Sequence, residues 1–116
     1  MKLYGIRNCD TVKKARAWLA DQGIEMTFHD FKSEGVTMDQ LDRWVKAVSW
    51  ETLLNRKGTT WRGLPDEVKD GVTDAASAKR VMLENPSVIK RPVLELDDKV
   101  NVGFSPEKYN ELFGYR

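Results

Sequence analysis

The strongest constraint on the fold comes from two strand-like stretches near the end of the chain. "VIKRPVLEL" at 88–96 and "KVNVGF" at 99–104 are rich in apolar residues and are separated by Asp97-Asp98. Two such runs joined by two turn residues are typical of a β-hairpin. Ser105-Pro106-Glu107 then opens a closing helix, with proline at its first position, that ends at Gly114. The chain therefore ends in the order β-β-α.

The beginning of the chain predicts a β-α-β unit. Residues 2–6 are a short apolar run, and a helix follows that begins at Asp10 or Thr11 and ends near Gln22, before a glycine. Residues 24–31 alternate apolar and polar side chains, which indicates a second strand. Apolar residues recur in the helix at three- and four-residue spacing, which indicates one buried face: Val12, Ala15, Trp18 and Leu19.

Residues 33–86 have a different, mainly helical pattern. Helices are expected from Thr37 and from Thr73-Asp74, the second ending near Glu84, and Ser49 caps a short turn between them. The polar, glycine-containing segment 56–71 is interpreted as an exposed connector. Neither flank resembles a flexible linker, so 33–86 is expected to be an insertion into an α/β core.

At 116 residues, the chain is expected to form one domain, 1–116, with a core of 1–32 and 87–116. Nineteen basic and eighteen acidic residues give a formal charge of +1, which argues against direct nucleic-acid binding through bulk charge. No run approaches the roughly 18 apolar residues of a membrane helix, and the N-terminus lacks the apolar core of a signal peptide. We expect a cytoplasmic monomer.

Cys9, the single cysteine, lies between the first strand and the first helix. Unpaired N–H groups and the dipole at a helix N-terminus favour a thiolate, and such thiols titrate below the usual value of about 8.5. Arg7, Lys13 and Lys14 are close in sequence and can add positive potential. A reactive thiol is therefore the preferred interpretation, and a small apolar core residue is the alternative.

Arg91-Pro92, at the start of the third strand, is the second signal. An X–Pro bond can be cis at low cost, and proline is tolerated where a strand begins. Taken alone, the pair fits a proline at a strand end beside a solvated arginine. A cysteine after the first strand combined with a proline before the third is the arrangement of thioredoxin-like folds.

With these features the chain resembles the arsenate-reductase-like family, which includes ArsC, the Spx regulators and YffB-type proteins. The resemblance covers nearly the whole chain and rests on Cys9, "LLNRKGTTWR" at 53–62, "ENPSVIKRPVLEL" at 84–96 and "VGFSPEKY" at 102–109. It is closest to the YffB-type branch. It implies an α/β, thioredoxin-like fold with a four-stranded mixed sheet flanked by helices.

The resemblance also implies the chemistry. It places the nucleophile on Cys9, an anion- or thiolate-binding residue on Arg91 and the cis-proline on Pro92. Arg56 matches a further family arginine only approximately, because Asn55 disturbs the register. Lys13 is a weaker candidate for added positive potential. Glutathione is implied as cosubstrate, glutaredoxin is a further candidate partner, and no bound cofactor is expected.

Three departures from the family change the expected activity. Phe104 stands where arsenate reductases have a third arginine, and Gly5 stands where they have a histidine. Cys9-Asp10-Thr11-Val12 lacks the second cysteine of dithiol relatives, so a mixed disulfide at Cys9 needs an external thiol. The first hypothesis is therefore a glutathione-dependent monothiol oxidoreductase. The alternative is a non-enzymatic, Spx-like regulator that binds RNA polymerase, and arsenate reduction ranks third.

Two further residues were weighed as site candidates. His29 and Cys9 alone do not provide the four ligands of a usual zinc site, so no metal site is expected. His29 also fits a satisfied or exposed histidine better than a catalytic partner of Cys9. Trp61 could line the mouth of a thiol-binding groove or anchor its loop.

Overall fold

A mixed four-stranded sheet forms the centre of the molecule in the computed structural model, which describes residues 1–114. Its strands are β1 (Lys2–Gly5), β2 (Thr27–Asp30), β3 (Val93–Glu95) and β4 (Val100–Val102), in the order β2-β1-β3-β4. β1 pairs in parallel with β2, whereas β1 with β3 and β3 with β4 are antiparallel. The sheet and its flanking helices confirm the predicted α/β class.

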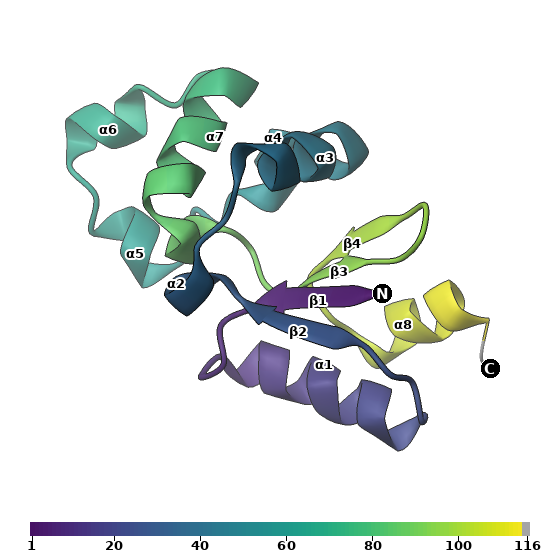
Figure 1. Cartoon of the computed structure of the whole chain (residues 1–116). Helices are drawn as coiled ribbons and strands as arrows, with labels where there is room; N and C mark the ends of the chain where they lie inside the picture. Colours follow the sequence, from purple (N-terminus) through teal and green to yellow (C-terminus); the bar gives the residue numbers. More distant parts are fainter. Residues whose placement is uncertain (115–116) are drawn as a thin grey trace.

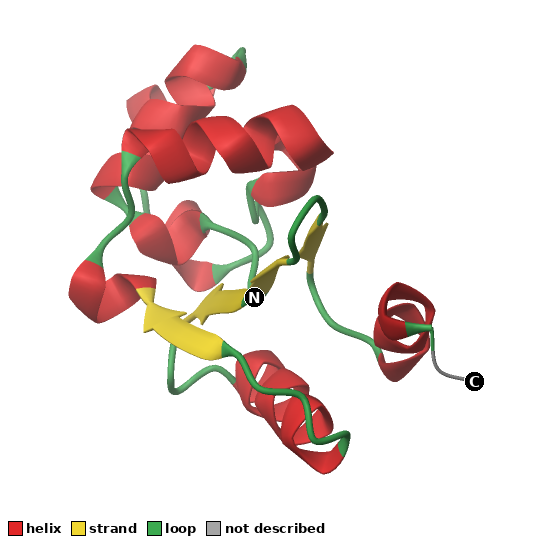
Figure 2. Ribbon diagram, turned by 45° about the vertical axis from the view of Figure 1, so that its right-hand side comes forward, coloured by secondary structure: helices red, strands yellow, loops and turns green. Residues whose placement is uncertain are grey.

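Helices cover both faces of this sheet (Figures 1 and 2). α1 (Asp10–Asp21) and α8 (Pro106–Phe113) lie on one face, and the helices between β2 and β3 lie on the other. Side chains of a strand alternate between faces, and neighbouring residues accordingly enter two separate apolar clusters. Leu3 and Leu94 pack with α1 and α8, whereas Tyr4 and Val93 pack with the helical segment.

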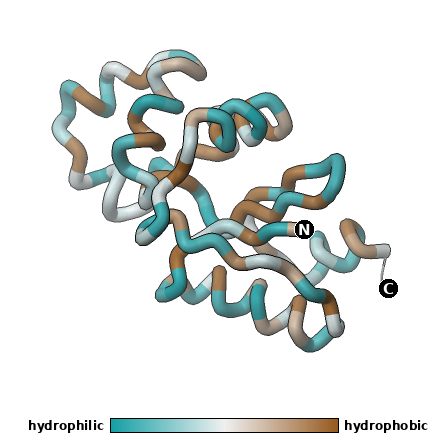
Figure 3. The backbone as a smooth tube through the Cα atoms, viewed as in Figure 1, coloured by the Kyte–Doolittle hydropathy of each residue, from teal (hydrophilic) through white to brown (hydrophobic). Residues whose placement is uncertain are grey.

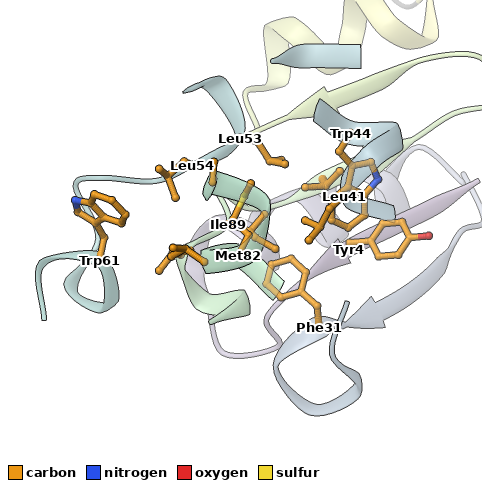
Figure 4. Close-up of a cluster of buried hydrophobic side chains, with 13 residues drawn as sticks. Tyr4, Phe31, Leu41, Trp44, Leu53, Leu54, Trp61, Met82 and Ile89 are labelled. Atoms are coloured by element: carbon orange, nitrogen blue, oxygen red, sulfur yellow. The ribbon is translucent and has the colours of Figure 1, made fainter. Parts of the chain in front are cut away.

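The predicted helical segment contains α2 (Phe31–Glu34), α3 (Met38–Val48), α4 (Trp50–Leu53), α5 (Thr59–Arg62), α6 (Asp66–Asp70), α7 (Ala75–Glu84) and the 3-10 turn η1 (Pro86–Val88). Capping boxes at Thr37 and Asp74 start the two longest of these helices, as the sequence predicted. Trp44 of α3 and Met82 of α7 belong to the same buried cluster (Figure 4). The division of the chain into one domain with an insertion stays a prediction.

The segment 56–71 is mostly exposed, as predicted, but the prediction of a connector without helices or buried residues is wrong. α5 and α6 lie in this segment, and Trp61 from α5 is only 9% exposed and belongs to the cluster under the helical segment (Figure 4). Four- and five-residue helices are too short to show an apolar period, so local patterning gave no sign of them. The burial of the large Trp61 side chain holds α5 in place, whereas α6 buries no residue.

All four strands are shorter than predicted, β2 and β3 most clearly. β2 ends at Asp30 because its carboxylate accepts hydrogen bonds from the N–H groups of Lys32 and Ser33 and so starts α2. All of 88–92 lies outside β3, and Ile89 there forms an isolated bridge with Leu54.

Apolar and polar segments alternate along the chain (Figure 3). Within residues 1–114, none of the helices is long and apolar enough to cross a membrane.

Candidate active site

Cys9 lies at the point where the chain leaves the sheet and enters α1. Its N–H donates to the carbonyl of Ile6 at 3.1 Å, and its own carbonyl accepts the N–H of Lys13 at 2.9 Å. Cys9 is therefore itself the N-cap residue of α1, one position before the predicted Asp10. The tight turn and the helix start hold the half-buried sulfur at the N-terminal end of α1.

The surroundings of Cys9 favour the thiolate. Burial by itself would raise the pKa of the Cys9 thiol, but the backbone N–H of Val12, the Arg91 guanidinium and the N–H of Thr11 together lower it below its ordinary value. The sulfur forms no capping hydrogen bond of good geometry with these N–H groups, so they act mainly as dipoles directed toward it.

Arg91 approaches from the loop that connects η1 with β3. Its Nη1 donates to the carbonyl of Ser87 at 2.8 Å and lies 3.5 Å from the carbonyl of Ile89, which fixes the guanidinium against the loop. Its Nε is buried and has no partner within the part of the chain that the structure describes. The Arg91–Pro92 peptide bond is cis, and the carbonyl of Pro92 accepts the N–H of Gly103 at 2.8 Å.

A cleft of about 480 Å³ opens beside Cys9. Four parts of the chain form it: the start of α1, the end of α4, the loop before β3, and β4 with the start of α8. The lining residues are Cys9, Thr11, Asn55, Lys90, Arg91, Asn101, Val102, Gly103, Phe104, Ser105 and Lys108.

The cleft is suited to an anion. Lys90, Arg91 and Lys108 line it, and among its described lining residues there is no carboxylate. Lys108 also forms a surface ion pair with Glu111 at 3.6 Å. Because Glu111 is not among the described lining residues, the lining itself carries a positive charge. Ser105 caps α8 by accepting the N–H of Lys108 at 3.1 Å, so the N-terminal ends of two helices border the same cleft.

The structure brings two of the five predicted site residues, Cys9 and Arg91, to this cleft. Pro92 is buried beneath it, and the Lys13 side chain is exposed on α1. Arg56 instead places its guanidinium over the ring of Trp50 at 5.3 Å, while its neighbour Asn55 lines the cleft. Pro92, Lys13 and Arg56 all lie outside the described lining residues.

His29 has a hydrogen-bond partner within the protein and is absent from the described lining of the cleft. Its Nε2 lies 2.9 Å from the carbonyl of Gly35, and its ring lies 5.0 Å from that of Tyr4, on the face that packs against the helical segment. Trp61 anchors α5 and is absent from the described cleft lining. Within residues 1–114, no group of three or more His, Cys, Asp or Glu side chains could hold a metal ion.

Sequence reasoning missed Lys90, Asn101 and Lys108 as cleft residues. Lys90 directly precedes Arg91, so the "IKRP" run contained a signal for a second cation. Lys108 lies in the first turn of α8, where a cation opposes the helix dipole, and this unfavourable position was a signal for a role in a site. Asn101 gave no comparable signal, because its place depends on the pairing of β4 with β3.

Two solved structures are particularly similar to this chain. One is a YffB protein, 47% identical, with a TM-score of 0.90 over 95% of this chain and 96% of that one. The other is an arsenate reductase (ArsC) related protein from Brucella melitensis, 57% identical, with a TM-score of 0.75 over 97% of this chain and 92% of that one. These similarities confirm the thioredoxin-like fold.

Similar sequences include a regulator as well as a protein without an assigned role. An uncharacterized protein of Haemophilus influenzae is 42% identical over 111 residues, which is 96% of each chain. The global transcriptional regulator Spx 2 of Bacillus anthracis is 21% identical over 95% of this chain and 84% of its own length. The ArsC family model matches residues 4–112. The chain therefore belongs to the ArsC family.

Proposed function

We propose that this protein is a glutathione-dependent monothiol oxidoreductase with Cys9 as its nucleophile. The observation that carries the proposal is the position of Cys9 at the N-cap of α1, beside Arg91 and open to a cleft without acidic lining residues in the described chain. Membership of the ArsC family and the similarity to an arsenate-reductase-related protein support thiol chemistry at this site. The cytoplasm, where glutathione is plentiful, is the proposed compartment.

The reaction proceeds in two thiol–disulfide exchanges. The Cys9 thiolate attacks the glutathione sulfur of a mixed disulfide, the disulfide bond breaks, and the other thiol leaves as a thiolate that takes up a proton. A second glutathione thiolate then attacks the Cys9–glutathione disulfide and releases oxidised glutathione and the Cys9 thiolate. In sum, one mixed disulfide and one glutathione thiol become one free thiol and one molecule of oxidised glutathione, so one disulfide bond breaks and one forms. Because Cys9 is the only cysteine, an external thiol is required.

The cleft residues hold the glutathionyl group during both steps. Glutathione carries two carboxylates, and Lys90 and Lys108, which both line the cleft, are the cations that pair with them. Arg91 stabilises the Cys9 thiolate from the lining of the cleft. Pro92 fixes Gly103 through its carbonyl, and so supports the part of the cleft that follows β4. Lys13 and Arg56 act only through long-range charge.

The rate of iodoacetamide alkylation against pH tests the nucleophile first. A midpoint below the ordinary thiol value of about 8.5 is expected for Cys9. Incubation with oxidised glutathione should then give one adduct by mass spectrometry, and reduced glutathione should remove it. The Cys9→Ser variant is the control and should give no adduct. A midpoint at or above the ordinary value, or a failure to form the adduct, would reject the proposal.

A regulator that binds RNA polymerase is the second candidate. The similarity to Spx 2 over 95% of this chain is the observation that favours it. In this case Cys9 would be a one-thiol sensor or a remnant. Binding to the isolated C-terminal domain of the polymerase α subunit separates the candidates, because a free reductase should not bind it.

Arsenate reduction is less well supported. Phe104 lines the cleft at the position where the resemblance places the third arginine of arsenate reductases. A phenyl ring donates no hydrogen bond to an oxyanion. Glutaredoxin remains a proposed partner that could reduce the Cys9 adduct in place of glutathione.

A further inference from the structure

The outer edge of β4 carries unpaired backbone groups. β4 is an outer strand of the described sheet, paired with β3 on one side. The N–H of Gly103 donates to Pro92 and that of Leu96 donates to Lys99, so residues 99, 101 and 103 direct their backbone groups toward β3. In an antiparallel ladder the alternate residues face the other way. Val100 and Val102 therefore present their N–H and C=O groups outward.

A groove of about 470 Å³ runs along this edge. Ala47 at the end of α3 forms one wall, and Lys108 and Leu112 of α8 form the other. β4 lies between these helices in Figure 1. The floor is the end of the hairpin turn and the first part of β4, from Asp98 to Asn101. A groove that has backbone of β4 in its floor and a helix on each side can accept one further strand.

The groove is continuous with the Cys9 cleft. Asn101 and Lys108 line both hollows, so a chain lying on β4 reaches the cleft without crossing the surface of a helix. The groove lining is basic on balance, with Lys99 from the hairpin and Lys108 from α8 against the single carboxylate of Asp98. The opposite edge of the sheet, β2, contributes no residue to the described lining of the cleft.

We propose that the substrate is a polypeptide, which binds in extended form as an added strand on β4 while its glutathionyl group occupies the Cys9 cleft. This inference rests on the proposed function and names the substrate class for it. Strand addition supplies affinity through main-chain hydrogen bonds, independent of sequence, and the lysines favour acidic side chains near the modified cysteine. Attack by Cys9 on the glutathione sulfur releases the peptide cysteine as a thiol and leaves the glutathionyl group on Cys9.

Peptides with blocked backbone groups test the strand addition. The probe is a short peptide with glutamates on both sides of a glutathionylated cysteine, prepared in two forms that are N-methylated at alternate residues of opposite parity. In a strand only one parity faces β4. We expect one form to lose about tenfold or more in kcat/KM and the other to match the unmethylated peptide. The mixed disulfide of glutathione and free cysteine is the small reference substrate.

A protein variant provides the complementary test. Val100→Pro removes the outward N–H without breaking the β3 ladder, and Val100→Thr keeps that N–H. Val100→Pro should lower kcat/KM for the peptide about tenfold and leave the small mixed disulfide unchanged, whereas Val100→Thr should leave both unchanged. Urea unfolding of both variants shows whether each is folded. If Val100→Pro does not fold, the methylated peptides alone decide whether the substrate adds to β4 as a strand.

The outcomes separate the two proposals. Equal kcat/KM for both methylated peptides would overturn the strand addition while the reductase function stands. No turnover of the small mixed disulfide would overturn the reductase function. In that event, the hydrogen exchange of the Val100 and Val102 amides is measured with and without a peptide in which serine replaces the cysteine. Slower exchange with the peptide supports strand addition on β4, and unchanged exchange overturns it.

Discussion

Gly5 lies so close to Val12 that a β-carbon on Gly5 would be 2.7 Å from Val12 Cγ2. Val12 is fully buried, and this contact joins the end of β1 to the first turn of α1, where Cys9 is held. Position 5 therefore has room only for a hydrogen atom. A larger residue at this position, such as the histidine expected from the resemblance to arsenate reductases, would require Val12 or α1 to shift.

Gly5→Ala should lower the free energy of unfolding by about 1–3 kcal/mol, because the added methyl must displace Val12 or the helix. Urea denaturation measures the loss. The double variant with Val12→Ala is the control, since removing both Val12 methyl groups creates the space. If the two losses are simply additive, Gly5 and Val12 do not clash.

Much of the secondary structure could be predicted because its signals are local. Thr37, Asp74 and Ser105 each accept a hydrogen bond from an N–H three residues later, so the residues that start these helices are neighbours in the sequence. The position of Cys9 before α1 was predictable for the same reason.

The composition of the cleft could be predicted only in part, because it depends on the packing of distant segments. Lys90 and Lys108 meet only through the β3–β4 pairing and the return of α8. Arg56 and Asn55 are neighbours, yet only Asn55 faces the cleft, since its N–H donates to Val88 at 2.8 Å. One residue of register decides this, and the family resemblance left that register open.

Trp61→Ala should lower the free energy of unfolding by about 3–5 kcal/mol, because a large buried ring is lost from the cluster under the helical segment. The alkylation rate of Cys9 under native conditions should stay unchanged, since Trp61 anchors α5 away from the cleft. Trp61→Phe is the matched control and should lose less. A change in Cys9 reactivity without a loss of stability would instead place Trp61 at the cleft.

Glu95 joins β3 to the helical segment and should make stability depend on pH. Burial would raise the pKa of the Glu95 carboxyl, but hydrogen bonds from Tyr4, Trp44 and Arg43 lower it below its usual value. A carboxyl with a lowered pKa stabilises the fold above its unfolded pKa of about 4.3, and this stabilisation is lost as the pH falls through the lower folded value.

Glu95→Gln should therefore cost about 1.5–3 kcal/mol in the free energy of unfolding at pH 7 and progressively less at acidic pH. Guanidinium unfolding at several pH values measures the difference. Glu25→Gln, which changes an exposed carboxylate, is the matched control and should have little effect at any pH. A constant cost for Glu95→Gln across the pH range would contradict the role of the charge.

Arg91→Gln should raise the pKa of Cys9, because it removes the guanidinium that helps to stabilise the thiolate. Alkylation at pH 7 should become slower, while the rate at high pH, where every thiol is ionised, should be preserved. Arg91→Lys keeps the charge, and its alkylation rate at pH 7 should lie between those of the natural protein and Arg91→Gln. Unfolding curves control for the lost bonds to Ser87 and Ile89. An unchanged midpoint in folded Arg91→Gln would remove Arg91 from the site.

Phe104 is expected to disfavour binding of an oxyanion such as arsenate in the Cys9 cleft. Its ring packs edge-to-face on Tyr109 at 4.7 Å and also lines the cleft, so a longer side chain at position 104 can reach the anion site. Phe104→Arg should increase the protection of Cys9 from alkylation by arsenate, because a planar cation is added near Arg91. Phe104→Leu controls for the lost aromatic contact and should give no protection beyond that of the natural protein. Equal arsenate protection in all three proteins would show that position 104 does not select the substrate.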